Sequence, residues 1–246
     1  MSVTLPVLGS GAVDDESDDG AGGVVRRNRS LIVVAVLAVL VVAVATWIVA
    51  FSPMFGANTV TVHGTKKLTV AQVHDAAAIK HGTPLVRLDT AAVARRVESL
   101  PLVASATVRT DYPSTVVITI TERVAVGYLT LGKKYLLVDK TGAQYRTVQT
   151  EPRLLPLFVV PAGPNAQATG QAVATVAASL TPALLASIAS VQAFDPTAIT
   201  LLLNDHRVVR WGSDERSADK ARILPVLLRQ PGTTFDLTNP DQVVTH

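Results

Sequence analysis

Residues 31–51 read LIVVAVLAVLVVAVATWIVAF, and this uncharged stretch decides how the rest of the chain is arranged. Twenty of its 21 residues are hydrophobic. As a helix rising about 1.5 Å per residue it would be roughly 31 Å long, which matches the hydrocarbon thickness of a bilayer. A helix at the surface of a soluble core would carry a polar face, and this stretch has none. The sequence therefore predicts a single transmembrane helix over 31–51.

The charges beside this stretch predict its orientation. Arg26, Arg27 and Arg29 lie on its N-terminal side, whereas no Lys or Arg follows it until Lys66. Because basic residues favour the cytoplasmic side of a membrane, residues 1–30 are predicted to be cytoplasmic and the bulk of the chain extracytoplasmic, the single-pass type II orientation. The N-terminal tail is rich in glycine and acidic residues, so it is expected to be disordered.

A cleaved signal peptide is the alternative interpretation of the apolar stretch. Ala43-Val44-Ala45 supplies the small-x-small pattern that a signal peptidase cleaves. The apolar run of 21 residues is, however, longer than that of a usual signal peptide, and a polar leader of 30 residues is unusual. These lengths favour a retained membrane anchor.

The composition of the whole chain excludes several classes of function. A length of 246 residues, 48% of them hydrophobic, allows one large domain or two small ones. The absence of cysteine excludes a disulfide scaffold, a thiolate metal site and a cysteine nucleophile. The 22 basic residues form no long run, and only 4% of residues are aromatic, so neither a phosphate-tracking stripe nor a base-stacking platform is present. Nucleic-acid binding is therefore not expected.

Residues 54–123 show the pattern of a small domain with the order strand, helix, helix, strand, strand. Thr69 followed by Gln72 is a capping box that opens the first helix, and Gly82 is expected to end it. Asp89 caps the second helix, which Pro101 closes. The strands are expected at 59–62, 103–109 and 115–121.

Residues 124–246 are predicted to form a mainly antiparallel sheet with flanking helices. Residues 151–164 contain four prolines around 157–160, which favours an edge strand or an extended segment there over a central strand. Ser213 is expected to cap a helix that runs to Arg229 with a kink at Pro225. The other strands are expected at 125–129, 134–138, 143–148, 187–194, 198–203, 207–211 and 233–238, and another helix at 166–180.

A series of short motifs follows the apolar stretch in a fixed order. They are VTVHG at 60–64, GTPL at 82–85, LPLVASA at 100–106, VRTDYPSTV at 108–116, TERVAV at 121–126, LVDKTG at 137–142 and VVRWG at 208–212. This order resembles the FtsQ/DivIB cell-division family. The resemblance implies an α+β fold, with a POTRA domain (β-α-α-β-β) over 54–123 and a β-domain over 124–246. One departure is Val124, where many family members carry proline.

The resemblance also implies a function. It implies a scaffold of the divisome at the division septum, one that is not an enzyme, needs no cofactor and has no small-molecule substrate. Such a scaffold links early cell-division proteins to late septal peptidoglycan synthesis. Family members bind FtsB/DivIC-like and FtsL-like bitopic partners, and they also contact FtsK, FtsW and FtsI.

Partner binding in this family is implied to involve the C-terminal part of the β-domain. Its physical form would be β-augmentation, in which an incoming strand pairs with the exposed backbone of a sheet edge. A strand face with alternating apolar residues is also what a buried core position shows, so Phe235, Leu237 and Val243 stay open as ordinary core residues. The candidate partner-binding residues are Thr233, Thr234, Phe235, Asp236, Leu237, Thr238, Val243 and Val244, with Leu228 on the preceding helix as a flanking contact.

Patterns of enzymatic chemistry are missing from the sequence. None of the five histidines belongs to a His-Glu-x-x-His pattern, and there is no Gly-x-Ser-x-Gly. Glu122 and Arg123 are interpreted as an ion pair at the end of a strand. The alternative function left open is a membrane-anchored extracytoplasmic enzyme or sensor that acts on the cell wall. A nucleophile, an acid/base pair or a metal cluster in the sequence would favour the enzyme.

Overall fold

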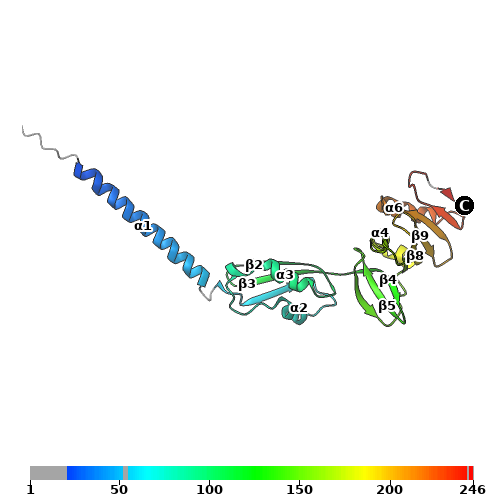
Figure 1. The fold of residues 1–246 in the computed structure, drawn as a ribbon, viewed down its shortest axis with the longest axis horizontal. Helices are drawn as coiled ribbons and strands as arrows, with labels where there is room; N and C mark the ends of the chain where they lie inside the picture. The colour runs from blue at the N-terminus through cyan, green and yellow to red at the C-terminus, as the bar shows by residue number, and fades with distance from the viewer. Residues whose placement is uncertain (1–20, 52–54, 243, 246) are drawn as a thin grey trace, which may run out of the picture.

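The computed structural model describes residues 21–51, 55–242 and 244–245, and the side chains of 32–48 and 55–242 (Figure 1). In chain order the described residues form a long helix, a small domain and a larger domain, arranged as an elongated molecule (Figure 1). Three sequence predictions fall outside the described residues: those on residues 1–20, on Val243, and on the side chains of Arg26, Arg27 and Arg29.

The N-terminal helix α1 is continuous over Ala21–Phe51. It ends where the apolar stretch ends, and it begins ten residues ahead of that stretch, within the expected tail. Within the part of the chain that the structure describes, no helix is both long enough and apolar enough to cross a membrane.

The small domain has the predicted order of elements. Its three-stranded sheet has the strand order β1-β3-β2, in which β1 runs parallel to β3 and β2 runs antiparallel to it. The helices contribute Val73, Val93 and Val97 to a core that also contains Val116 and Ile118 of the central strand. The elements are β1 (Thr59–His63), α2 (Val70–Ala77), the short 3₁₀ helix η2 (Leu85–Arg87), α3 (Thr90–Glu98), β2 (Val103–Asp111) and β3 (Thr115–Glu122).

Both predicted helix caps of this domain are present. The hydroxyl of Thr69 accepts the backbone N–H of Gln72 at 3.3 Å, and Asp89 Oδ1 accepts the N–H of Ala92 at 2.9 Å. The predicted end of the first helix was wrong, because α2 stops at Ala77 and the chain turns at Ala78, with φ 48°. Gly82 lies in the next loop instead, where its N–H donates to the carbonyl of Ala57 at 3.0 Å.

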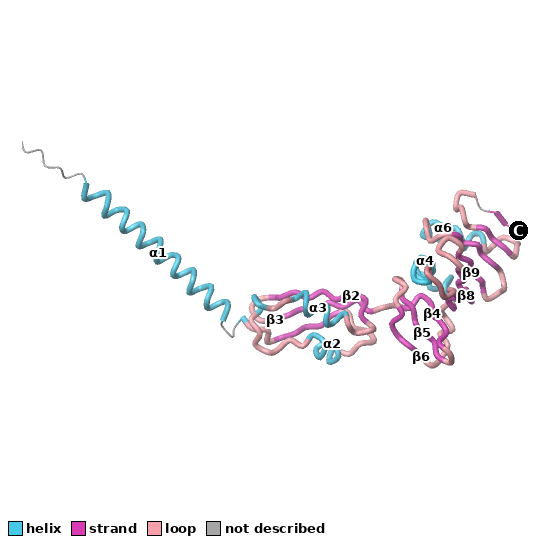
Figure 2. The backbone as a smooth tube through the Cα atoms, in the orientation of Figure 1, coloured by secondary structure: helices cyan, strands magenta, loops and turns pink. Residues whose placement is uncertain are grey.

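The larger domain is built on a nine-stranded sheet with the order β12-β11-β10-β9-β8-β7-β4-β5-β6. Figure 2 shows strands of this domain in magenta, with β4, β5, β6, β8 and β9 labelled. Most neighbouring strands are antiparallel, as predicted, and the parallel pairs are β4 with β7, β7 with β8, and β10 with β11. The strands are β4 (Ala125–Leu131), β5 (Lys134–Asp139), β6 (Gln144–Val148), β7 (Leu157–Val159), β8 (Ile188–Ala193), β9 (Ile199–Leu203), β10 (Val208–Gly212), β11 (Thr234–Asp236) and β12 (Val244–Thr245). The helices are α4 (Ala166–Ser179), α5 (Pro182–Ala186) and α6 (Ser217–Leu227).

Two predictions for this domain are corrected by the structure. The strand at 157–159 is central and not an edge, because its flanking prolines lie outside the paired residues and leave every ladder N–H in place. Ser213 does not cap α6, which begins at Ser217 after Arg216. The carbonyl of Ser213 instead accepts a hydrogen bond from Lys220 Nζ at 3.0 Å.

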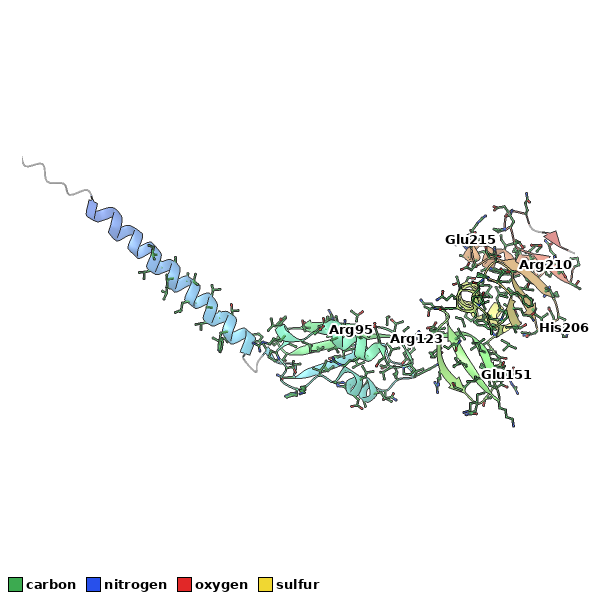
Figure 3. The ribbon with its side chains drawn as sticks, viewed as in Figure 1. Arg95, Arg123, Glu151, His206, Arg210 and Glu215 are labelled. Carbon is green, nitrogen blue, oxygen red and sulfur yellow. The ribbon has the colours of Figure 1, made fainter. Side chains whose placement is uncertain are left out.

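The joint between the two domains corrects the interpretation of Glu122 and Arg123 as an ion pair. Glu122 accepts the backbone N–H groups of Lys66, Lys67 and Leu68 at 2.6–3.0 Å, so it closes the loop after β1. Arg123, which Figure 3 shows between the domains, pairs instead with Asp139 at the end of β5. The carboxylate of Asp139 is 3% exposed and also accepts bonds from the Thr141 hydroxyl and backbone. This ion pair therefore joins the first domain to the β5–β6 turn.

Acidification is expected to weaken the stabilisation that the Asp139 carboxylate provides at the domain joint. Burial alone would raise the pKa of Asp139, but hydrogen bonds from Thr141 and Arg123 outweigh it and hold the pKa below the usual 3.8. Because the folded state binds this proton less readily than the unfolded state, the stabilisation is present above pH 3.8 and is lost as the pH falls through the lower, folded pKa. Asp139→Asn should therefore lower the free energy of unfolding by about 1.5–3 kcal/mol at neutral pH.

The measurement is urea unfolding of the wild type, Asp139→Asn, Arg123→Gln and the double variant over an acid pH series. The difference between wild type and Asp139→Asn should shrink once the pH is below 3.8. A difference that stays constant with pH, or additive effects of the two single substitutions, would contradict the joint described above.

Candidate functional site

The C-terminal end of the large sheet carries most of the predicted partner-binding residues. Strand β11 lies between β10, to which it is parallel, and the two-residue strand β12, to which it is antiparallel. Phe235 pairs with Thr245, and Asp236 pairs with Val244. Because β12 is the last strand of the sheet order, its outer side is the sheet edge. The exposed backbone at this end therefore belongs to β12 and not to β11.

The side chains of residues 233–238, which include β11, divide into buried and exposed positions. Phe235 and Leu237 are 0% exposed and belong to the main core of the domain, so for both the core interpretation is the one the structure shows. Thr233 and Thr238 are exposed, and Thr234 and Asp236 are half-buried. The backbone of Val244 is paired, while its side chain and the whole of Val243 lie outside the described residues.

Arg207 ties the helix α6 to this end of the sheet. Its Nη1 donates to the carbonyl of Leu228 at 2.7 Å, its Nε donates to Asp205 at 2.8 Å, and its guanidinium lies 5.7 Å from the ring centroid of Phe235. Leu228 itself is half-buried and packs against the core. The predicted flanking contact is therefore a packed residue whose carbonyl helps to fix the end of the helix.

The start of α6 is held by a buried lysine. Lys220 is 1% exposed, and its ammonium group donates to the carbonyls of Trp211 and Ser213 at 2.8 and 3.0 Å. Burial lowers the pKa of Lys220 below its ordinary value. The indole of Trp211 in turn donates to the hydroxyl of Ser217 at 3.1 Å. These bonds join the end of β10 to the first turns of α6.

The loop from β11 to β12 is tethered at two points. Gly212 has φ 77°, and a Cβ there would lie 3.0 Å from Thr238 Cγ2, so glycine lets the loop approach β10 closely. Arg216 makes a bidentate pair with Asp241, with N–O distances of 2.7 and 3.1 Å. The hydrogen bonds of this pair raise the pKa of Arg216 and lower that of Asp241. The pair therefore fixes the chain just before β12.

Breaking the Arg216–Asp241 pair is expected to loosen β12 without unfolding the domain. Both side chains are at least half exposed, and exposed pairs contribute little to global stability, whereas local opening depends on local tethers. Asp241→Asn should speed backbone exchange at 244–245 several-fold, as measured by hydrogen exchange with mass spectrometry, and should leave the urea midpoint almost unchanged. Asp195→Asn, which changes a carboxylate that accepts hydrogen bonds from Thr197 in the turn between β8 and β9, is the control. Unchanged exchange at 244–245 would contradict the tether.

Sequence reasoning missed Arg207, Arg216 and Asp241. Arg216 and Asp241 are 25 positions apart, and Arg207 and Leu228 are 21 apart, so no local pattern could join them. Among the described residues, no group of three or more His, Cys, Asp or Glu side chains is placed to hold a metal ion.

Together the elements define a two-domain α+β protein with an open sheet edge at its C-terminal end. Comparison with known families agrees with this architecture. An FtsQ-type POTRA domain matches residues 55–123, and the C-terminal region of cell division protein FtsQ/DivIB matches residues 127–239.

Relatives with the name cell division protein FtsQ share most of the chain. The protein of Mycobacteroides abscessus is 39% identical over 227 residues, which cover 92% of this chain and 73% of that protein. The protein of Mycolicibacterium smegmatis is 39% identical over 217 residues, covering 88% and 65%. The protein of Streptomyces venezuelae is 33% identical over 243 residues, covering 91% and 89%. The chain belongs to the FtsQ/DivIB family of cell-division proteins.

The solved structures that are similar to the chain include the major extracytoplasmic domain of the trans isomer of DivIB from Geobacillus stearothermophilus. The TM-score is 0.35 and the identity 18%, and the match covers 44% of this chain and 92% of that one.

Proposed function

We propose that this chain is a non-enzymatic divisome scaffold at the division septum, which links early cell-division proteins to late septal peptidoglycan synthesis. Its work is to bind FtsB/DivIC-like and FtsL-like bitopic partners, with FtsK, FtsW and FtsI as further contacts. Membership of the FtsQ/DivIB family supports the divisome role. The observation that carries the binding mode is the position of β12 at the end of the large sheet.

The proposal includes a membrane anchor. Residues 31–51 would cross the bilayer as part of α1, with Arg26, Arg27 and Arg29 on the cytoplasmic side and both domains outside. The apolar sequence of this stretch and its continuous helix support the anchor. A charged residue at Val39 should therefore reduce membrane insertion, by roughly 2.5–3.5 kcal/mol.

Partner binding would occur by strand addition to β12. The partner strand would pair with the outer backbone of Val244 and Thr245, while Thr233 and Thr238 present exposed side chains on either side of β11. Phe235, Leu237 and Leu228 would act by supporting the edge from the core. A two-residue strand can form only about two backbone hydrogen bonds at its outer edge. At ~0.5–1.5 kcal/mol each these contribute about 1–3 kcal/mol, so side-chain contacts of the partner must add to them.

Depletion of the protein from its own cells tests the function. A scaffold of the divisome should leave cells that grow as filaments or chains, blocked at septation. Normal septa combined with altered wall chemistry would overturn the scaffold and would favour the alternative, an anchored enzyme or sensor that acts on the cell wall. Complementation with the wild-type chain is the control.

A further inference from the structure

Two loops of the small domain flank the chain at the point where it enters that domain. Helix α1 ends at Phe51, and the described chain resumes at Phe55. On one side the N–H of Ala57 donates to the carbonyl of Thr83 at 2.8 Å, and the N–H of Gly82 donates back to Ala57 at 3.0 Å. On the other side the N–H of Asn58 donates to the carbonyl of Ser114 at 2.9 Å. The loops at 80–87 and 111–114 therefore lie at the same end of the domain as the entering chain.

This end must lie close to the end of α1. Four peptide steps separate Phe51 from Phe55, and a fully extended chain of that length spans at most about 14 Å. Figure 1 shows the same arrangement, with the end of α1 next to the small domain. If 31–51 crosses a bilayer, these two loops are the part of the domain nearest its surface.

The exposed side chains on these loops are of the kinds that favour a membrane surface. Tyr112 is 55% exposed and Val86 is 57% exposed. Lys80 and Arg87 are exposed on the same loop as Val86, and Asp111 is the exposed acidic residue beside Tyr112. Tyrosine favours the headgroup region because its ring is apolar and its hydroxyl is polar, and lysine and arginine attract anionic headgroups. The end of the domain thus combines an apolar and a cationic character.

We propose that the loops 80–87 and 111–114 rest on the outer surface of the bilayer. Tyr112 and Val86 enter the headgroup region, and Lys80 approaches the phosphates of anionic lipids. The occupant of this surface is lipid and not another protein, because the entering chain holds both loops within a few residues of the helix end. The inference rests on the proposed anchoring by 31–51. Its consequence is that the small domain is held in a defined orientation, from which the second domain projects away from the membrane.

The natural absence of cysteine makes a direct test simple. The full chain is placed in lipid nanodiscs as single-cysteine variants that carry an environment-sensitive fluorophore. His81→Cys and Asp111→Cys report on the two loops, and Lys66→Cys, an exposed position beside Glu122 at the far end of the sheet, is the control. The nanodiscs contain phosphatidylcholine alone or mixed with phosphatidylglycerol, and lipids with a doxyl quencher are added in a second series.

The two loop labels should show blue-shifted emission that the doxyl lipids quench, and the label at 66 should show neither. Phosphatidylglycerol should enlarge the shift at 81, and Lys80→Glu should remove that enlargement. Tyr112→Ser should reduce the shift at 111. If the chain is incorporated into nanodiscs but the loop labels emit as they do in water, this inference is overturned, whereas the proposed membrane anchor is not contradicted. A chain that does not enter nanodiscs would contradict the anchor and this inference together.

Discussion

The substitution Val244→Pro is expected to abolish co-purification of the proposed FtsB-like partner. A two-residue strand offers few backbone groups, so the loss of one N–H and the added ring remove much of the pairing surface. Each lost bond leaves a partner group unpaired, at about 1–3 kcal/mol, which corresponds to a dissociation constant raised about tenfold or more. The measurement is the affinity of the full chain for the extracytoplasmic segment of the partner.

The substitution Thr245→Pro provides a matched comparison with Val244→Pro. Successive N–H groups of a strand point to opposite sides, so one of the two prolines removes a donor to β11 and the other removes a donor at the outer edge. Both should weaken partner binding, whereas only one should speed hydrogen exchange in β11. The substitution Arg146→Pro in β6, which is the opposite edge strand of the same sheet, should leave the affinity for the partner unchanged. Full binding by both β12 variants would exclude this edge.

Truncation of Phe235 to Ala should lower the free energy of unfolding of the second domain by about 3–5 kcal/mol. The ring is fully buried in the main core and lies beneath the Arg207 guanidinium, so its removal leaves a cavity. A loss of this size is a large part of the roughly 5–15 kcal/mol that holds a typical domain folded. Substitutions of Phe235 therefore test the stability of the fold. A charged residue at this position would reduce partner binding by unfolding the domain and not by removing a direct contact with the partner.

Urea unfolding followed by tryptophan fluorescence measures this effect. The chain has two tryptophans, and Trp211 is buried in the same core, so a Trp47→Phe background reports on the second domain alone. Thr233→Ala, at an exposed position on the same segment, should change stability by less than about 0.5 kcal/mol. A Phe235→Ala chain as stable as the wild type would contradict the buried assignment.

Elements with local signals were predictable from the sequence. The Thr69 capping box and the Asp89 cap each join residues three positions apart, and both are present. The strands were also predictable, because the alternation of apolar and polar residues that marks a half-buried strand is complete within a few residues. The order of elements in the small domain followed from these signals alone.

Features decided by distant neighbours were not predictable in this way. The strand at 157–159 is central because β4 and β8 enclose it, which its flanking prolines cannot indicate. Arg123 pairs across the domain joint with Asp139, and Arg216 pairs with Asp241, both by contacts that form only after the chain has folded. For the candidate site, the sequence left open whether Phe235 and Leu237 are core residues, and their burial became visible only in the folded domain.

Hydrogen exchange on the full chain, with and without the extracytoplasmic segment of the proposed FtsB-like partner, tests the central claim most directly. The two edges of the large sheet, β12 and β6, serve as test and control within one molecule. Strand addition predicts slower exchange at 243–245 when the partner is bound and unchanged exchange at 144–148. Protection at β6 with none at β12 would contradict the account, as would binding that protects neither edge.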